Sequence, residues 1–360
     1  MSSPAIPAAK LASSVTTNLS NLASRTLASA PAINPICPTQ VSLMNSVKCI
    51  IPALSNQLHK GQAGRIGIVG GSKDYTGAPF FASMSSMRFG CDMSYTICTP
   101  EAGSVIKTYS PDLIVNRLLD PEEEWETVEK NVGELFERFH AVVIGPGLGR
   151  DEFMQRCAKL CINLAKKNSM YLVIDADGLW LLQNEPDLIK GYRRAILTPN
   201  AAEFARLCNT VGVDSKKDPD NAAKDLAKAL SGPTVLEKGK VDRITNGKEV
   251  LIVDAEGGLK RCGGQGDILA GCLGTFAGWC KIYEENHPNL AQTSANADGG
   301  EVALDRLLLL AGYGASLTAR ECSRLAFKSK ARAMLADDLL PVVGDAYEGL
   351  WGDVQEKAQL

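Results

Sequence analysis

The segment Ala141-Val-Val-Ile-Gly-Pro-Gly-Leu-Gly149 decides the fold class. A short apolar run such as Ala141 to Ile144 is typical of a buried strand, and the glycine- and proline-rich turn after it ends that strand. Similar runs alternate with helical patterns from Arg65 onward, which predicts an α/β fold with a central, mostly parallel sheet flanked by helices. Further strands are expected at Arg65 to Val69, Met93 to Thr99, Tyr171 to Ile174, Ala195 to Leu197, Thr234 to Leu236 and Val250 to Val253.

The composition excludes several classes of protein. Apolar residues make up 45% and charged residues 22% of the chain, which argues against wholesale disorder and fibrous architectures. With a net charge of −3, the chain has no overall excess of positive charge to attract nucleic acid or anionic lipid. A small-molecule partner is therefore expected. The longest weakly polar stretch, Leu307 to Ala319, is shorter than the roughly 20 residues that span a bilayer, so no membrane segment is expected.

The two ends of the chain are set apart from the predicted core. No acidic residue precedes Asp74, and the first residues are rich in Ser, Ala, Thr, Asn and Pro with scattered Lys and Arg. This composition is typical of an organelle transit peptide, and equally of a disordered tail without a targeting signal. We therefore expect a disordered or targeting leader over 1–40, one domain over 41–350, a C-terminal tail over 351–360, and a cytoplasmic or mitochondrial protein.

Helical segments are predicted from apolar residues that recur at the helical period. One helix is expected over Glu122 to Phe139, and an N-terminal helix over about 41 to 62, with Val47, Ile50, Ile51 and Leu54 packed on the domain. The polar run Asn286 to Gly300 is expected to be a surface insertion. Two helices are expected after it, at Glu301 to Thr318 and Glu321 to Leu335.

The sharpest motif is Cys262-Gly-Gly-Gln-Gly-Asp267, followed at once by an apolar helix. A glycine-rich turn at a helix N-terminus exposes unpaired N–H groups and the positive end of the helix dipole, and together these form a phosphate site. Asp267 is expected to keep its charge there and to accept a hydroxyl proton from a group that receives phosphate. The alternative is that Asp267 only caps the helix.

Two further motifs follow predicted strands. Asn200 and Glu203 come three apart at the start of a helix, where they could hold Mg²⁺ through water, with Glu203 as an indirect ligand. The same spacing also fits a capping box, with Asn200 as the N-cap. Lys238 could reach nucleotide phosphates, or could be an ordinary surface lysine. Because ligands bind at the carboxyl ends of strands in open α/β sheets, these turns are expected to converge.

In order along the chain, these segments resemble the ATP-dependent NAD(P)H-hydrate dehydratases, a branch of the ribokinase-like small-molecule kinases with a three-layer fold. The resemblance covers roughly residues 45 to 350. The matching segments are Gly64 to Ser72, Tyr75 to Pro79, Ala141 to Gly149, Val173 to Leu179, Leu197 to Phe204, Leu236 to Gly239 and Cys262 to Asp267.

The resemblance implies a lyase of the hydro-lyase class that repairs nicotinamide nucleotides. It would dehydrate the S epimer of NADH and NADPH hydrated at C6, with ATP as co-substrate, Mg²⁺ as cofactor and Asp267 as catalytic base. A separate NAD(P)H-hydrate epimerase would supply the S epimer, and a homo-oligomer is possible. The hydrated nucleotide would contact Gly147, Gly149, Asn200, Ala201, Ala202, Glu203, Phe204, Ala205, Arg206 and Asp267. ATP would contact Lys238, Gly239, Lys240, Val241, Asp242, Gly257, Gly258, Leu259, Lys260, Arg261, Cys262, Gly263, Gly264, Gln265 and Gly266.

Three other functions compete with this hypothesis. A ribokinase-like kinase of a small hydroxylated vitamin precursor, of the hydroxymethylpyrimidine or hydroxyethylthiazole type, would use Asp267 and its turn equally well. A nucleotide-binding protein without turnover would need Asp267 only as a cap. An NAD-dependent dehydrogenase is disfavoured, because the acidic ribose ligand expected about 20 residues beyond Gly145 to Gly149 has no convincing candidate.

Overall fold

The computed structural model describes residues 38–290 and 302–356. The chain divides into two compact units, Met1–Val41 and Ser42–Leu360, and the fold described below belongs to the second. Of the first unit, only the opening turn of helix α2 (Pro38–Lys48) is described. The predicted leader over 1–40 therefore lies almost entirely outside the described residues.

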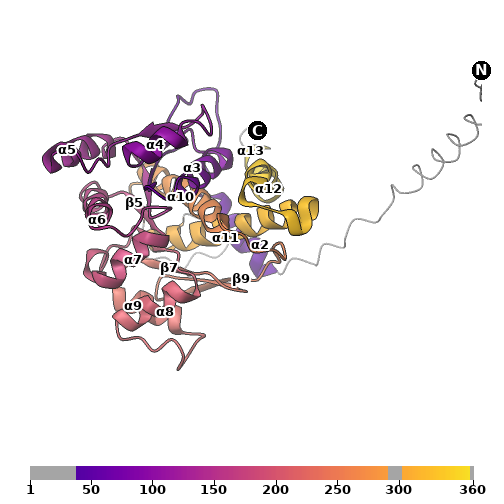
Figure 1. The fold of residues 1–360 in the computed structure, drawn as a ribbon. Coiled ribbons are helices and arrows are strands. Elements are labelled where there is room, and N and C mark those ends of the chain that lie inside the picture. Colours follow the sequence, from indigo (N-terminus) through magenta and orange to yellow (C-terminus); the bar gives the residue numbers. More distant parts are fainter. Residues whose placement is uncertain (1–37, 291–301, 357–360) are drawn as a thin grey trace, which may run out of the picture. The chain divides into compact units, whose positions relative to one another are not determined.

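A nine-stranded sheet forms the centre of the fold (Figure 1). Its strand order is β3-β2-β1-β4-β5-β6-β7-β8-β9. Every neighbouring pair from β3 to β7 is parallel, and the last two pairs, β7 with β8 and β8 with β9, are antiparallel. The strands are β1 Arg65–Val69, β2 Met93–Ile97, β3 Ile114–Asn116, β4 Ala141–Ile144, β5 Tyr171–Ile174, β6 Ala195–Leu197, β7 Thr234–Glu237, β8 Asp242–Thr245 and β9 Val250–Val253.

Two strands were missing from the sequence prediction. β3 has only three residues and lies at the edge of the sheet, so its apolar signal is too short to recognise. β8 begins with the charged pair Asp242-Arg243, which is typical of a loop, and only its pairing with β7 and β9 makes it a strand. Asp242, expected in a nucleotide-binding loop, is thus the first residue of a strand.

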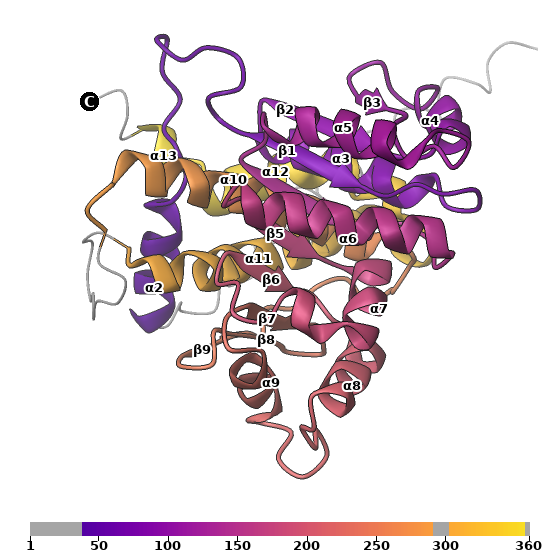
Figure 2. The same ribbon diagram turned by 90° about the vertical axis from the view of Figure 1, so that its left-hand side faces the viewer.

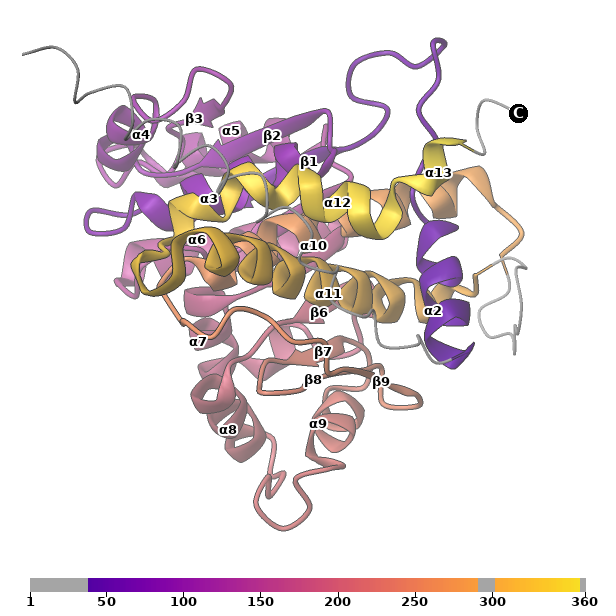
Figure 3. The same cartoon turned by 90° about the vertical axis from the view of Figure 1, so that its right-hand side faces the viewer.

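Helices cover both faces of the sheet, giving three layers. Strand side chains alternate between two cores: Val142 and Ile144 pack with helices α5 to α9, whereas Val143 packs with α3, α10, α11 and α12. Figures 2 and 3 show these two helical layers from opposite sides. The helices are α3 Gly77–Phe89, α4 Pro100–Ile106, α5 Trp125–Phe136, α6 Glu152–Lys167, α7 Ala176–Asn184, α8 Ala201–Thr210, α9 Ala222–Leu230, α10 Gln265–Asn286, α11 Leu304–Lys330, α12 Val343–Trp351 and α13 Asp353–Glu356, with short 3-10 turns at Pro186–Leu188, Ala331–Ala333, Ala336–Asp338 and Leu340–Val342.

The helices near the two ends differ from their predictions. The two helices expected after residue 300 are one continuous helix, α11, of 27 residues. The apolar period runs without a glycine or proline through the expected break, and Leu317 and Cys322 on either side of it are both buried. At the other end, α2 stops at Lys48; Val47, Ile50 and Ile51 are buried as expected, but Leu54 is 55% exposed.

The predicted insertion after α10 is described only in part. Asn286 is the last residue of α10, and 291–301 lie outside the described residues. In the part of the chain that the structure describes, no helix is both long and apolar enough to cross a membrane.

Helix α10 sits directly on the sheet because its inner face is built from glycine. A Cβ atom added to Gly271 would lie 2.1 Å from the carbonyl oxygen of Ala82 and 2.1 Å from the hydroxyl of Ser85, both on α3. One added to Gly274 would lie 2.6 Å from Val143 on β4. Since packed cores resist added volume, the position of α10 depends on these missing side chains.

We expect Gly271→Ala to lower the free energy of unfolding by about 1 to 3 kcal/mol, because the new methyl group must push α10 and α3 apart. The matched control is Gly133→Ala in α5, where the nearest atom is a Leu164 methyl carbon at 3.9 Å. That substitution should be neutral or stabilise by up to about 1 kcal/mol through helix propensity. Urea unfolding of both variants measures the difference, and equal effects would show that the glycine face does not constrain packing.

Candidate active site

The turns that follow the parallel strands lie side by side at one edge of the sheet. Backbone hydrogen bonds connect neighbouring turns beyond the strand ends: Gly71 N to Gly147 O (3.0 Å), Asp175 N to Ile144 O (3.0 Å) and Thr198 N to Ile174 O (3.1 Å). The same series continues with Lys238 N to Pro199 O (2.9 Å). The predicted convergence of these turns is therefore present in the structure.

The glycine turn leads into α10 as its sequence predicts. The N-cap is Gly264, whose φ of +92° is a conformation that glycine adopts readily. The first intrahelical bond runs from Ile268 N to Gly264 O (3.1 Å), so the N–H groups of residues 265 to 267 have no acceptor within the helix. A Cβ atom added to Gly263 would meet no atom within 4 Å, so this part of the turn is open to a ligand.

Asp267 lies in the first turn of α10 and is half-buried. It is not the cap of this helix, because Gly264 holds that position. The alternative that Asp267 serves only as an N-cap is therefore wrong. Its carboxylate is close enough to Asp175 and Lys238 for their charges to act on it.

An ion pair between the buried Asp175 and the half-buried Lys238 lies against this turn. Asp175, at the end of β5, is 3% exposed and accepts hydrogen bonds at Oδ1 from Lys238 Nζ (2.9 Å) and Thr198 Oγ1 (2.7 Å). A Cβ atom added to Gly266 would lie 3.8 Å from Lys238 Nζ and 3.9 Å from Asp175 Oδ2. The pair and the first turn of α10 therefore form one charged centre.

This centre changes the acidity of its members. Burial, reinforced by the carboxylate of Asp175, raises the pKa of Asp267 to about 7, against the opposing pull of Lys238. Burial alone would lower the pKa of Lys238, but Asp175, Glu203 and Asp267 outweigh it and raise that pKa. The expectation that Asp267 keeps its charge thus holds only above about pH 7.

Asn200 and Glu203 form the capping box that their spacing allowed. Asn200 Oδ1 accepts from the backbone N–H groups of Ala202 and Glu203 (both 3.0 Å), and Glu203 Oε2 accepts from Asn200 N (2.8 Å). Burial raises the pKa of Glu203, although Lys238 acts against this. Asn200 also lines the cavity beside Lys238, so the cap and the charged centre share one wall.

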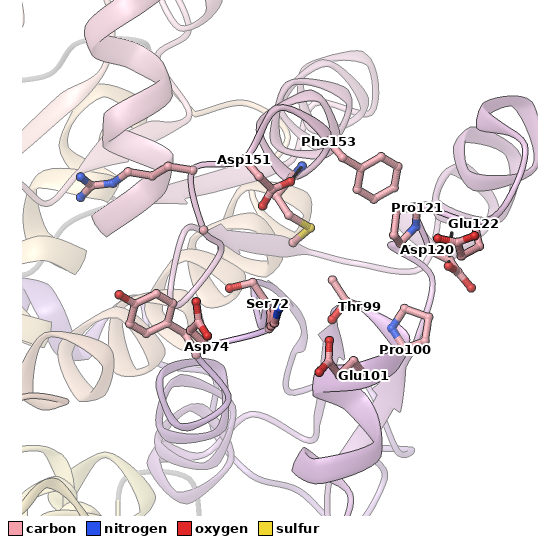
Figure 4. A pocket seen from close by; sticks show the side chains of 15 residues that line it. Ser72, Asp74, Thr99, Pro100, Glu101, Asp120, Pro121, Glu122, Asp151 and Phe153 are labelled. Atoms are coloured by element: carbon pink, nitrogen blue, oxygen red, sulfur yellow. Dashed lines mark hydrogen bonds between the residues drawn. The ribbon is translucent and has the colours of Figure 1, made fainter.

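The other residues predicted to contact the hydrated nucleotide are spread around this edge. Ala201, Ala202 and Arg206 are exposed on α8, Ala205 is half-buried, and Phe204 is 5% exposed and packs into the core. Gly147 faces Tyr75, since an added Cβ would lie 2.9 Å from Tyr75 Cβ. Gly149 lines a second cavity, at the ends of β1 to β4. Figure 4 shows this cavity from close by.

A cavity of about 570 Å³ adjoins the glycine turn on the side of β6 and β7. It brings together most of the residues predicted to bind ATP. Lys240, Val241, Gly258, Leu259 and Lys260 are not in its wall; Leu259 is 85% exposed, and Gly258 is buried against α11. The lining residues are Asn200, Lys238, Gly239, Asp242, Gly257, Arg261, Cys262, Gly263, Gly264, Gln265, Gly266, Leu269, Ser316, Ala319, Arg320 and Ser323.

Helix α11 supplies the part of this wall that the sequence analysis missed. Arg320 pairs with the buried carboxylate of Asp242 and donates to the carbonyl oxygens of Ala255 (2.8 Å) and Gly239 (3.1 Å). Ser316, one turn earlier, donates to Asp242 Oδ2 (2.6 Å). Asp242 is therefore an anchor for the turn after β7 rather than a free ligand. A serine and an arginine four apart in a mostly apolar helix were the available signal.

We expect Asp267→Asn to stabilise the protein in a pH-dependent way. The pKa of Asp267 rises from 3.8 to about 7 on folding, so ionisation of this group opposes folding increasingly between these two values. Asparagine carries no charge to bury. The variant should gain roughly 2 to 4 kcal/mol above about pH 7 and nothing below about pH 4.

Thermal unfolding across this pH range measures the effect. The control is Asp187→Asn, a side chain that is 90% exposed and should show no pH-dependent gain. If the variant is less stable than the native protein at about pH 8, ionisation of Asp267 does not oppose folding.

Comparisons with known proteins agree with this geometry. Residues 66–343 match the family model described as NAD(P)H-hydrate dehydratase. The ATP-dependent (S)-NAD(P)H-hydrate dehydratase of Mycosarcoma maydis is 73% identical over 355 residues, covering 99% of both chains. That of Bos taurus is 43% identical over 312 residues, covering 86% of this chain and 89% of its own.

Solved structures share the fold. The ADP/ATP-dependent NAD(P)H-hydrate dehydratase of Bacillus subtilis, co-crystallised with ATP and Mg²⁺, superposes with a TM-score of 0.59 at 20% identity. The match covers 85% of this chain and 97% of the bacterial chain. With the family model spanning most of its length, and a close relative matching from end to end, the chain belongs to the NAD(P)H-hydrate dehydratase family.

Proposed function

We propose that this chain dehydrates the S epimer of hydrated NADH and NADPH, consuming ATP and releasing ADP and phosphate. The observation that carries this is the carboxylate of Asp267, whose pKa of about 7 is suited to accepting a proton near neutrality, in a turn built to hold phosphate. Family membership supports the choice of substrate. The chain is accordingly a hydro-lyase that repairs nicotinamide nucleotides.

The reaction divides into a phosphoryl transfer and an elimination. Asp267 takes the proton of the C6 hydroxyl group, whose oxygen attacks the γ-phosphorus of ATP while the bond to ADP breaks. The N–H groups of the glycine turn stabilise the negative charge that develops. The lone pair of the ring nitrogen then expels phosphate from C6, and loss of a proton from C5 restores the double bond. Hydroxide leaves poorly, so phosphorylation is what makes the elimination feasible.

The binding roles follow from the positions of the residues. ATP would lie along the turn after β7 and the glycine turn, with Lys238 close to its phosphates, and Arg320 would hold the Gly239 turn in place. The hydrated nucleotide would contact Gly147, in the turn after β4, and Asn200, which also borders the ATP cavity. The predicted residues Gly149, Ala201, Ala202, Glu203, Phe204, Ala205 and Arg206 would line or support the same region.

Magnesium fits this site as a companion of ATP rather than as a resident ion. Among the described residues, no cluster of three or more His, Cys, Asp or Glu side chains could hold a metal ion by itself. Mg²⁺ keeps much of its hydration shell and would bind through the phosphates, with Glu203 contacting its water. When bound, it would neutralise charge on the transferring phosphoryl group.

Three wider proposals accompany this activity. The R epimer requires a separate NAD(P)H-hydrate epimerase, which would act immediately before this enzyme. The domain is proposed to span 41–350, with a leader before it and a tail after it. The composition of that leader supports a cytoplasmic or mitochondrial location.

The decisive assay mixes the purified chain with acid-hydrated NADH, magnesium and ATP. We expect the absorbance of the reduced nicotinamide ring to return in step with free phosphate. A kinase of a vitamin precursor would instead yield a stable phosphorylated product and leave hydrated NADH unchanged. Asp267→Asn should lower turnover by about 10² to 10⁴ while ATP still binds, since the base is lost. Unchanged turnover would remove Asp267 from the mechanism.

The pH dependence of turnover tests the charged centre. Because Asp267 must be ionised, kcat/KM should fall as the pH drops through about 7. Asp175→Asn removes a neighbouring negative charge and leaves Lys238 unpaired, and both changes favour the ionised form of Asp267. The acid limb of the profile should therefore move to lower pH by about one unit. Asp187→Asn is the control, and a limb that stays in place in Asp175→Asn would contradict the assignment.

A further inference from the structure

The turn after β4 presents Gly147 to the hydrated nucleotide in the proposed function, and this turn is rich in glycine. Gly145, Gly147 and Gly149 have φ values of +128°, +61° and +86°, a region that residues other than glycine rarely adopt. Three such residues close together give the turn little stiffness of its own. Its place in the site therefore depends on the contacts that hold it.

The turn lies directly on the start of α7. A Cβ atom added to Gly145 would lie 1.8 Å from Asp175 O, and one added to Gly178 would lie 2.6 Å from Ile144 O. The two backbones thus touch where these glycines face them. Because the carboxylate of Asp175 pairs with Lys238, a shift of the turn relative to α7 is also a shift relative to the charged centre.

Asp177, in the first turn of α7, holds the turn through its carboxylate. Asp177 Oδ2 accepts from Gly149 N (3.0 Å), and Oδ1 accepts from Arg150 Nε (2.8 Å). On the opposite side, Gln155 Nε2 donates to Gly149 O (2.8 Å). The Asp177 side chain is 15% exposed and lines neither of the two larger cavities. Asp177 therefore acts on the turn and not directly on a bound nucleotide.

These bonds leave one donor of the turn free. Gly147 O accepts from Gly71 N (3.0 Å) and from Ser72 Oγ (3.1 Å), but the N–H group of Gly147 has no acceptor among the described residues. Backbone N–H groups are nearly always paired, so an unpaired one beside an active site indicates a ligand contact. The direction of this N–H group depends on how Gly149, two residues later, is held.

A strained residue separates the two aspartates. Ala176 has a φ of +45°, in the left-handed region that residues with a Cβ atom adopt only at a cost in free energy. Such a conformation persists where contacts on both sides enforce it, and it is concentrated at functional sites. Here Asp175 is held by Lys238 and Thr198, and Asp177 by the turn after β4. The strain at Ala176 thus directs two nearby carboxylates to different partners.

We propose that Asp177 is a positioning residue for the hydrated nucleotide. By holding the N–H group of Gly149, it sets the place of Gly147 relative to Asp175 and the charged centre. The inference rests on the proposed function and adds to it a residue that contacts neither nucleotide. The ATP cavity contains no residue of the turn after β4, so ATP is held independently of Asp177.

Steady-state kinetics of Asp177→Ala test this role. We expect the KM for the hydrated nucleotide to rise about tenfold, with kcat and the KM for ATP within about twofold of the native values, because only the turn loses its support. Glu185→Ala is the matched control, since it breaks the ion pair with Lys159 at the other end of α7 (2.5 Å) and should leave both KM values unchanged. Equal changes of the two KM values in Asp177→Ala, or no change, would overturn the inference.

Two conservative variants separate the hydrogen bond from the charge, and they also decide the matter if Asp177→Ala does not fold. Asp177→Asn keeps an oxygen that accepts from Gly149 N, so its KM for the hydrated nucleotide should stay within about threefold of native. Asp177→Glu keeps the charge but moves the oxygens by one methylene group, so its KM should be raised. The reverse order would assign the effect to the ion pair with Arg150 and contradict the proposal.

Binding of NADPH, followed by its fluorescence, tests the role without turnover. Asp177→Ala should bind NADPH, a product of the proposed reaction, about tenfold more weakly than the native protein, whereas Asp177→Asn should not. If this pattern appears but no hydrated nucleotide is dehydrated, the proposed function fails and the positioning role stands. Equal affinity of the native protein and Asp177→Ala would refute the positioning role even where dehydration is observed.

Discussion

The ion pair between the buried Asp175 and the half-buried Lys238 is the constraint on which the site depends. A buried carboxylate is tolerated only when it is paired and hydrogen-bonded, and Asp175 satisfies this with Lys238 and Thr198 together. The pair joins the ends of β5 and β7 across β6 and lies against Gly266 in the first turn of α10. The position of an ammonium group and the acidity of Asp267 are thereby fixed by the same contact.

Much of this arrangement could be predicted from local sequence. The central strands are continuous apolar runs ended by glycine or aspartate, and a parallel sheet brings such ends together. The glycine turn before α10 was also predicted, because a glycine-rich run directly before an apolar helix is one way to form an anion site at a helix N-terminus. Strands β3 and β8 could not be found in this way, since one is too short and the other owes its conformation to its neighbours.

The features that the sequence did not predict depend on contacts between distant parts of the chain. Arg320 looks like an ordinary polar residue of a helix, and only the fold brings it to Asp242 and the turn at Gly239. The raised pKa of Asp267 is a second case, because a helix N-terminus argues for an ionised group while burial and Asp175 argue against it. Which effect prevails depends on distances that no sequence pattern encodes. The capping box at Asn200 depends only on local sequence, and the spacing of Asn200 and Glu203 predicted it.

The glycine face of α10 has a consequence for how such an enzyme can diversify. Because its glycines pack directly against α3 and β4, helix α10 and the glycine turn at its N-terminus have almost no freedom to shift without disturbing the hydrophobic core behind them. The turns after β1 and β4 are restricted in the same way, since a Cβ atom added to Gly70 would lie 1.9 Å from Pro146 O and one added to Gly145 would lie 1.8 Å from Asp175 O. A change of substrate range should therefore come from exchanged side chains around these turns rather than from shifts of their backbone.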